Sequence, residues 1–288
     1  MIYNTKEILQ EAKKNKYAVG AFNVINMETT QAVLEAAKEM RSPVIIQLTE
    51  KTIDYAGGKN IFSLIKNLAN FYYPEIPVAI HLDHGKNFEI IKKAIALGFP
   101  SVMYDASRKS FQDNLQETKE IAQYCHKKNV SIQAELGNVP NYRELDMQNI
   151  NWDDYMTKPE EAVQFVQETK IDTLAVGIGN AHSFTQERPE PDYNRLEKIS
   201  QLVETPLVLH GASDWEGERV KKVIDKGISC FNIDTALRVA FTDSLVSTLT
   251  KNLEKISYDL RRTLGEARKA VKEEVKHKIK LFGSDNKI

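Results

Sequence analysis

The chain has 288 residues, which is long enough for a single α/β barrel of about 250 residues. Hydrophobic residues make up 42% and charged residues 27%, and 39 Lys and Arg nearly balance 40 Asp and Glu, so the net charge of -1 gives no reason to expect nucleic acid or an anionic membrane as a partner. Two cysteines, no run of 18 apolar residues and no signal pattern at the N-terminus predict a soluble, cytoplasmic protein.

Short apolar, β-branched runs recur along the chain and are typical of buried strands. They lie at 17–22, 43–48, 77–83, 101–106, 131–137, 173–179, 206–212 and 230–235. Segments with helical spacing lie between them, at 27–40, 87–99, 111–129, 159–170 and 217–227. Alternation of this kind predicts parallel strands joined by crossover helices, and eight strands close a barrel. No glycine-rich nucleotide motif, which an open sheet of this type would carry, is present.

No linker or shift of composition divides the chain, and residues from about 236 to 288 have a helical pattern. The predicted fold is therefore α/β, with residues 1–288 forming a single (β/α)8 TIM barrel with additional C-terminal helices.

Polar residues within the apolar runs fall almost entirely at the carboxyl ends of the strands. In a barrel these ends share the face on which active sites are built. The residues are Asp83, His84, Asp105, Glu135, His182 (just after its strand), His210, Asn232, Asp234 and Thr235.

Three of the six histidines, His84, His182 and His210, follow three different strands. Neutral imidazole suits zinc, and three such ligands leave a position open for substrate, so the pattern favours a catalytic divalent metal over three separate structural histidines. His81 lies deeper in its strand and is expected to make a structural hydrogen bond. Asp83 and His84 are adjacent, and they can share a face only if the strand ends at Asp83 and Gly85 relieves the turn.

A phosphate site is the second expectation at this face. The segments 210–213 and 232–235 end the seventh and eighth strands, where barrel enzymes often bind phosphate. Gly211 allows a close approach of the backbone, and Ser213 and Thr235 supply hydroxyl groups. Taken alone, each segment could also be an ordinary turn.

With these motifs assembled, the sequence resembles the class II, metal-dependent ketose-bisphosphate aldolases, which act on fructose- and tagatose-1,6-bisphosphate. The likeness runs from "YAVGAFNVINMET" at 17–29 through "HLDHG", "SVMYDAS", "AELG", "LAVGIGNAH", "LVLHGAS" and "FNIDT" to "FGSDNKI" at 282–288. It implies zinc on His84, His182 and His210, proton transfer by Asp83, and metal neighbours in Asp105 and Glu135. Its phosphate contacts fall on Ser183, Gly211, Ser213, Asn232, Asp234 and Thr235, and its distal substrate contacts fall less securely on Asn23 and Arg261.

Two departures from the family pattern stand out. The family follows "ELG" with a glycine-paired loop that ends in a catalytic glutamate, whereas this chain has "ELGNVPNYRELD". Counting places Arg143 at the glutamate position, and the preferred interpretation is that Glu144, one residue on, takes the role. In "NAHSFTQ", Ser183 and Gln186 replace a glycine and a lysine of the family, which makes the phosphate end less cationic.

The resemblance implies a lyase that cleaves a phosphorylated ketose to dihydroxyacetone phosphate and an aldehyde in sugar metabolism. It also implies one Zn²⁺ per subunit, a monovalent cation as a further expected ligand, and a homodimer or homotetramer. Two alternatives stay open: a zinc-containing sugar-phosphate binding protein that has lost turnover through the altered loop, and another divalent-metal barrel enzyme such as an epimerase.

Overall fold

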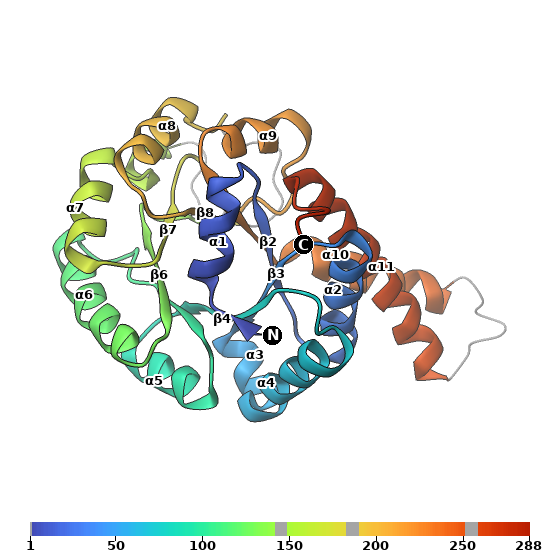
Figure 1. Cartoon of the computed structure of the whole chain (residues 1–288). Helices are drawn as coiled ribbons and strands as arrows, with labels where there is room; N and C mark the ends of the chain where they lie inside the picture. The colour runs from blue at the N-terminus through green and yellow to red at the C-terminus, as the bar shows by residue number, and fades with distance from the viewer. Residues whose placement is uncertain (1, 142–148, 183–189, 251–258) are drawn as a thin grey trace.

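A computed structural model describes residues 2–141, 149–182, 190–250 and 259–288 (Figure 1). Eight parallel strands form a closed barrel, because β4 pairs with both β3 and β5. Their order around the barrel is that of the chain, so the predicted (β/α)8 fold is confirmed. The strands are β2 (Val19–Asn23), β3 (Val44–Thr49), β4 (Val78–Gly85), β5 (Ser101–Tyr104), β6 (Ser131–Leu136), β7 (Thr173–Val176), β8 (Leu207–Leu209) and β9 (Ile228–Ile233).

Helices surround the barrel (Figure 1). The elements outside the barrel strands are α1 (Thr5–Lys14), α2 (Met27–Met40), α3 (Glu50–Ala56), α4 (Gly58–Asn67), the π-helix η1 (Leu68–Tyr72), α5 (Phe88–Leu97), α6 (Phe111–Lys127), the 3-10 helix η3 (Trp152–Tyr155), α7 (Pro159–Thr169), α8 (Tyr193–Leu202), α9 (Gly217–Asp225), α10 (Thr235–Thr250) and α11 (Leu260–Phe282). All five helices predicted between strands are present, and most begin at a side-chain cap such as Asn26 or Asn87.

The N-terminal segment adds two elements that the sequence pattern did not reveal. Strand β1 (Ile2–Tyr3) pairs with β4 in parallel register. Helix α1 places Ile8, Leu9 and Ala12 against small inward residues of the strands, such as Ala21 and Ala79. The helix therefore closes the amino-terminal end of the barrel and leaves the carboxyl ends of the strands open for a site.

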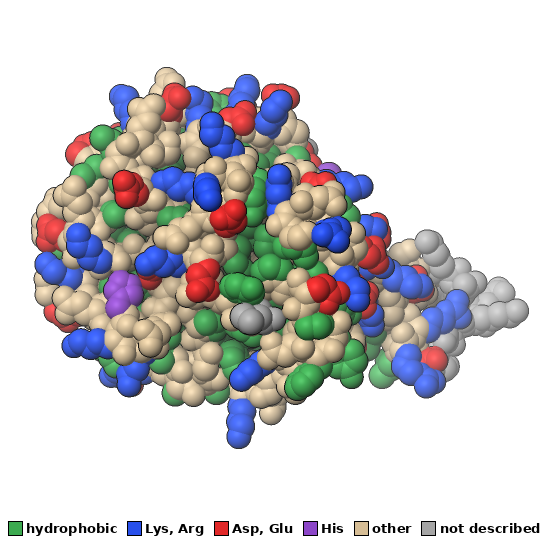
Figure 2. Space-filling view, viewed as in Figure 1, with side chains coloured by type: hydrophobic (Ala, Val, Ile, Leu, Met, Phe, Trp, Pro, Cys, Tyr) green, Lys and Arg blue, Asp and Glu red, His purple; other side chains and the backbone are tan. Residues whose placement is uncertain are grey.

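The face that carries α1 shows no concentration of one charge. Figure 2 shows Lys and Arg interspersed with Asp and Glu over this surface, in keeping with the net charge of -1. Within the described parts of the chain, no helix is long and apolar enough to cross a membrane.

Strand β4 corrects one expectation. The strand does not end at Asp83 but runs to Gly85, with an irregular register between Leu82 and Gly85 on the β5 side. The left-handed backbone falls on His84 (φ 49°), not on Gly85. Gly85 is required for another reason: a Cβ there would lie 2.8 Å from the backbone oxygen of Met103. The irregularity lets the neighbours Asp83 and His84 both reach the cavity.

The two C-terminal helices pack on one flank of the barrel. Helix α11 lies against α2 and α10, and Phe282 stacks on Phe231 of β9 with ring centroids 4.4 Å apart. Helix α10 begins directly after β9 at Thr235, so the last strand leads straight into the helical region at the mouth of the barrel.

Candidate active site

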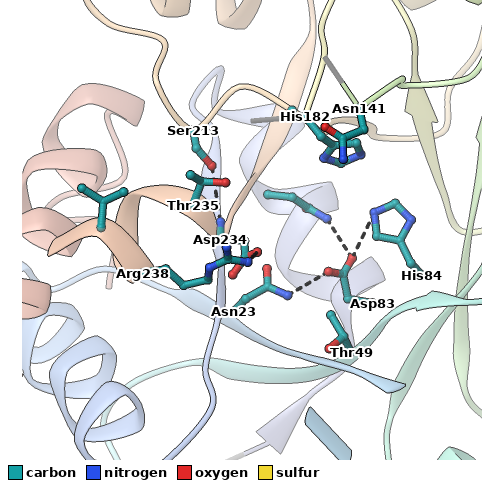
Figure 3. A pocket seen from close by; sticks show the side chains of 13 residues that line it. Asn23, Thr49, Asp83, His84, Asn141, His182, Ser213, Asp234, Thr235 and Arg238 are labelled. Atoms are coloured by element: carbon teal, nitrogen blue, oxygen red, sulfur yellow. Dashed lines mark hydrogen bonds and ion pairs between the residues drawn. The ribbon is translucent and has the colours of Figure 1, made fainter. Parts of the chain in front are cut away.

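A cavity of about 460 Å³ opens at the carboxyl ends of the strands (Figure 3). It brings together residues that lie as far apart as 23 and 239 in the sequence. Its lining residues are Asn23, Thr49, Asp83, His84, Asn141, His182, Gly211, Ser213, Asn232, Asp234, Thr235, Arg238 and Val239.

The three predicted histidines converge at one side of this cavity. Ring nitrogens of His84, His182 and His210 all lie within 4.8 Å of one another, so the group could hold a metal ion. Nε2 of His84 lies 3.1 Å from Nδ1 of His210. Two ligands of a tetrahedral zinc ion lie roughly 3.3 Å apart, because each is about 2.0 Å from the metal. The ring positions therefore suit a small divalent ion.

Two of the rings are oriented by buried partners. Nδ1 of His84 lies 2.7 Å from a carboxylate oxygen of Asp105, and Nε2 of His210 lies 3.0 Å from Oε1 of Gln133. Each partner oxygen can accept a hydrogen bond from that ring nitrogen, and His210 Nε2 also lies 3.0 Å from the amide nitrogen of Asn232. With protons on His84 Nδ1 and His210 Nε2, the nitrogens His84 Nε2 and His210 Nδ1 would offer lone pairs to a metal.

Asp105 is held by several donors besides His84. The Nζ group of Lys86 forms an ion pair with it, and Ser107 donates to it from its backbone nitrogen (3.1 Å) and its hydroxyl (2.7 Å). These contacts place the carboxylate behind His84 as an orienting group. Since its oxygens are already occupied, direct metal ligation would require Asp105 to give up some of these donors.

Glu135 is different, because it keeps an oxygen without a donor. Oε1 accepts a hydrogen bond from the backbone nitrogen of Val139 at 3.2 Å, whereas Oε2 is buried without a hydrogen-bond partner among the described residues and lies 3.4 Å from Nδ1 of His210. Burial and the charge of Asp105 raise the pKa of Glu135 to about 7. An orphaned carboxylate oxygen beside three imidazoles is a further feature that suits a bound cation.

The pKa values of the three histidine rings differ widely. Burial alone would lower the pKa of His84, but Asp83 and the hydrogen bond to Asp105 raise it to about 9. Burial and the neighbouring His84 lower the pKa of His182 to about 4, and the same causes lower that of His210 well below its ordinary value. At neutral pH the second ring proton, and with it the positive charge, is accordingly favoured on His84, and a bound metal would displace that proton.

Asp83 lies beside the cluster and faces the cavity (Figure 3). Its carboxylate accepts hydrogen bonds from the amides of Asn23 (2.8 Å) and Asn232 (3.3 Å). Burial would raise its pKa, but electrostatic interactions with His84 and His210 and the hydrogen bond from Asn23 lower it below the ordinary value. Asp83 is therefore an ionised base at neutral pH, held by two neutral amides.

The opposite side of the cavity is built from backbone and short side chains. Gly211 adopts a left-handed conformation (φ 62°), and a Cβ there would lie 2.6 Å from the backbone carbon of Ala181. Ser213 Oγ accepts a hydrogen bond from the backbone nitrogen of Asp234 at 3.3 Å, and Thr235 begins α10. A glycine turn beside the N-terminus of a 16-residue helix is suited to an anion.

The remaining expected site residues divide into three groups. Asn23 lines the cavity, where its amide donates to Asp83, and its distal contact with substrate stays a prediction. Arg261 lies at the start of α11 with its side chain 92% exposed, paired with Asp259, and it does not line the cavity. Glu144, Arg143, Ser183 and Gln186 lie outside the described residues.

Several residues of the site were not predicted. Gln133 shares a strand face with Glu135 by simple alternation, which was the available signal. Arg238 follows Asp234 by one helical turn, and its guanidinium lies 3.1 Å from that carboxylate. Among the described residues that line the cavity, Arg238 is the sole Lys or Arg. Lys86, one residue beyond the "HLDHG" motif, was also missed.

Comparison with known proteins places this geometry in a family. The family model described as "Fructose-bisphosphate aldolase class-II" matches residues 3–287. The chain is 42% identical to a fructose-bisphosphate aldolase of Thermus caldophilus, with 99% of both chains covered, and 40% identical to a sulfofructosephosphate aldolase of Alkalicoccus urumqiensis, with 98% and 96% covered. It also superposes on the crystal structure of the YdjI aldolase from Escherichia coli K12 with a TM-score of 0.84 and 33% identity, covering 100% and 99% of the two chains.

The chain belongs to the class II fructose-bisphosphate aldolase family. The predicted family and the prediction of a lyase that acts as an aldolase on phosphorylated ketoses are thereby confirmed. The family is generally metal-dependent, and the histidine cluster is where this member could bind its metal.

Proposed function

We propose that the protein is a zinc-dependent aldolase that reversibly cleaves a ketose 1-phosphate with a second anionic group at its far end. The products are dihydroxyacetone phosphate and an aldehyde. The observation that carries the proposal is the convergence of three imidazoles, with ligand atoms within 4.8 Å of one another, beside the ionised Asp83 and opposite the glycine turn.

Zinc bound by His84, His182 and His210 would supply a Lewis acid for the C2 carbonyl of the ketose. In the proposed cleavage, Asp83 removes the proton of the C4 hydroxyl and the C3–C4 bond breaks. The electron pair of that bond stays with the C1–C3 fragment and is delocalised towards the C2 carbonyl, and the aldehyde leaves. The amides of Asn23 and Asn232 hold Asp83 in place for this transfer. In condensation Asp83 returns the proton to the new C4 oxygen.

The proposed phosphate contacts are Gly211, Ser213, Asn232, Asp234 and Thr235, with Ser183 beyond the described residues. The C3 proton is assigned to Glu144, which follows Asn141 of the cavity lining by three residues. This assignment rests on the sequence alone.

The far end of the proposed substrate carries the second anionic group. The two relatives at 42% and 40% identity carry names with different distal groups, a bisphosphate and a sulfofructose phosphate. Both phosphate and sulfonate are anions, and Arg238 supplies a cation at the cavity wall. We therefore assign Arg238 to recognition of a substrate anion.

Aldol cleavage by zinc-loaded protein, with and without a chelator, tests the proposal. The panel is fructose 1,6-bisphosphate, tagatose 1,6-bisphosphate, sulfofructose 1-phosphate and fructose 1-phosphate, with detection of triose phosphate. Chelator-sensitive cleavage is expected for at least one of the first three. Binding of these sugars without cleavage and without isotope exchange at C3 of dihydroxyacetone phosphate would instead favour a binding protein.

The remaining features of the proposal are a homodimer or homotetramer, a monovalent cation as an additional ligand, and a cytoplasmic location. Two buried free cysteines, Cys125 and Cys230, suit a reducing compartment. We also propose that residues 1–288 unfold as one domain, which calorimetry with and without zinc would test.

A further inference from the structure

The turn after β8 is anchored at both ends by buried polar contacts. At its start, the side-chain amide of Asn180 donates to the backbone oxygen of His210 at 2.9 Å. At its end, Nζ of Lys278 on α11 donates to the backbone oxygen of Trp215 at 3.4 Å and forms an ion pair with Glu216. Residues 211–214 are thereby held between Asn180 on the barrel side and Lys278 on α11.

Lys278 is an unusual side chain for its surroundings. The residue is 1% exposed, whereas its partner Glu216 has a half-exposed side chain and is shared with His277, whose Nε2 lies 2.8 Å from the second carboxylate oxygen. A buried ammonium group costs free energy unless it is paired and hydrogen-bonded, and such a pair often stabilises a fold no more than apolar side chains of the same size. The ion pairs of Lys278 with Glu216 and, at 3.7 Å, with Glu274 are therefore weak evidence for a purely stabilising role.

The contact of Lys278 with the turn after β8 explains a lysine at this position better than stability does. Trp215 is buried, and its backbone nitrogen donates to the backbone oxygen of Ala212 at 3.1 Å, which closes a tight turn around Ser213. The ammonium group of Lys278 donates a hydrogen bond to the backbone oxygen of Trp215, which ends this turn. A shift of α11 relative to the barrel would therefore move Ser213 and Gly211, which line the cavity.

The same helix also supports the second wall of the anion site. One helical turn beyond Lys278, Phe282 stacks on Phe231 with an interplanar angle of 8°. Phe231 directly precedes Asn232, which lines the cavity. Helix α11 thus fixes the backbone behind both segments that carry the proposed phosphate contacts.

We propose that Lys278 is a positioning residue for the phosphate-binding turn. It holds the turn where Gly211 and Ser213 meet the phosphate of the ketose, and so sets the affinity for substrate. The inference rests on the proposed function, because it takes that turn to be the phosphate site. The ring of His210 is held separately from the turn, since Gln133 contacts its Nε2 from the barrel side.

The test compares zinc-loaded wild type with Lys278→Met, Lys278→Arg and the control Lys272→Met. Lys272 lies on the same helix but forms its ion pair with Glu39 of α2 at 2.9 Å, away from the turn. We expect Lys278→Met to raise KM for the best ketose of the panel roughly tenfold with kcat and zinc content unchanged, because displacement of a binding group weakens ligand contacts before chemistry. Lys278→Arg should recover most of the affinity, and Lys272→Met should leave KM unchanged.

An unchanged KM in folded Lys278→Met would overturn the proposal, as would an equal increase in the control. If Lys278→Met does not fold, Glu216→Gln replaces it, since the side chain of Glu216 is half-exposed and the change removes the ion pair that helps to hold Lys278 at the turn. A smaller rise in KM is expected, because Lys278 keeps its hydrogen bond to Trp215. Calorimetric binding of inorganic phosphate separates this inference from the proposed function. If wild type cleaves no ketose but binds phosphate, weaker binding by Lys278→Met supports the positioning role, and equal binding by the two proteins overturns it.

Discussion

The two sides of the cavity are built in different ways. The histidine side consists of side chains in a strand or in the loops just beyond strands: His84 lies in β4, His210 directly follows β8, and His182 lies in the loop after β7. His210 and the orienting residues Asp105 and Gln133 are buried. The side proposed to bind phosphate consists of a turn and a helix start, where the side chains of Asp234 and Arg238 are 43% and 60% exposed. The barrel thus holds the histidines and Asp83 in place, whereas the rim is more exposed, and sequence can vary there at little cost to folding.

The largest expected effect comes from His84→Ala. Loss of one of three metal ligands should weaken zinc binding by at least about 100-fold and abolish cleavage. Chelator competition and the aldol assay measure the two effects. The fold should survive, because Asp105 keeps Lys86 and Ser107 as partners. A variant that retained both zinc and rate would contradict the metal assignment.

Asp83→Asn tests the base without touching the metal ligands. We expect kcat to fall by about 10²- to 10⁴-fold, because the amide cannot accept the C4 hydroxyl proton, while zinc content stays at the wild-type value. Asn23→Ala, which removes one donor to Asp83, is the milder comparison. A rate in Asp83→Asn within a few-fold of wild type would assign the proton transfer to another group.

Gln133→Leu tests whether the buried amide orients His210. Without the acceptor for Nε2, the ring can place its proton on Nδ1, and zinc affinity should fall roughly 10- to 100-fold. Gln47→Leu is a matched control, since Gln47 is equally buried on β3 but makes no described contact with the cluster. Equal zinc affinities in the two variants would remove Gln133 from the site.

Arg238→Met should have the smallest effect and should fall on the other side of the cavity. Loss of the cation is expected to raise KM for anionic ketoses about tenfold, with kcat and zinc affinity unchanged, since charge-assisted contacts at an exposed site are worth little more. Arg268→Met, which removes an ion pair between α11 and Glu35 of α2, is the control. A fall in kcat alone would indicate a role in chemistry instead.

Sequence reasoning recovered the barrel because its strands are short, apolar and bounded by turn residues. It also singled out His84, His182 and His210, which the structure brings together, because polar residues at or just after strand ends interrupt an otherwise apolar pattern. It missed Gln133 because that side chain lies one layer deeper, where only three-dimensional closure shows that it touches His210.

Two further misses have local causes. Arg238 follows a strand end by one helical turn, so linear order hides its place in the cavity. The backbone of β4 could not be predicted either. Alternation assigns Asp83 and His84 to opposite faces, and the presence of Gly85 led us to expect the turn there, whereas the left-handed residue is His84.

The left-handed backbone of His84 has a consequence for laboratory evolution. A residue with a Cβ pays conformational energy there that glycine avoids, and asparagine tolerates the same region better than most side chains. In the absence of metal, selection for heat resistance alone should therefore enrich glycine or asparagine at position 84. The selected variants would be more thermostable but would lack one proposed metal ligand. Selection for thermostability and selection for catalysis therefore favour different residues at position 84.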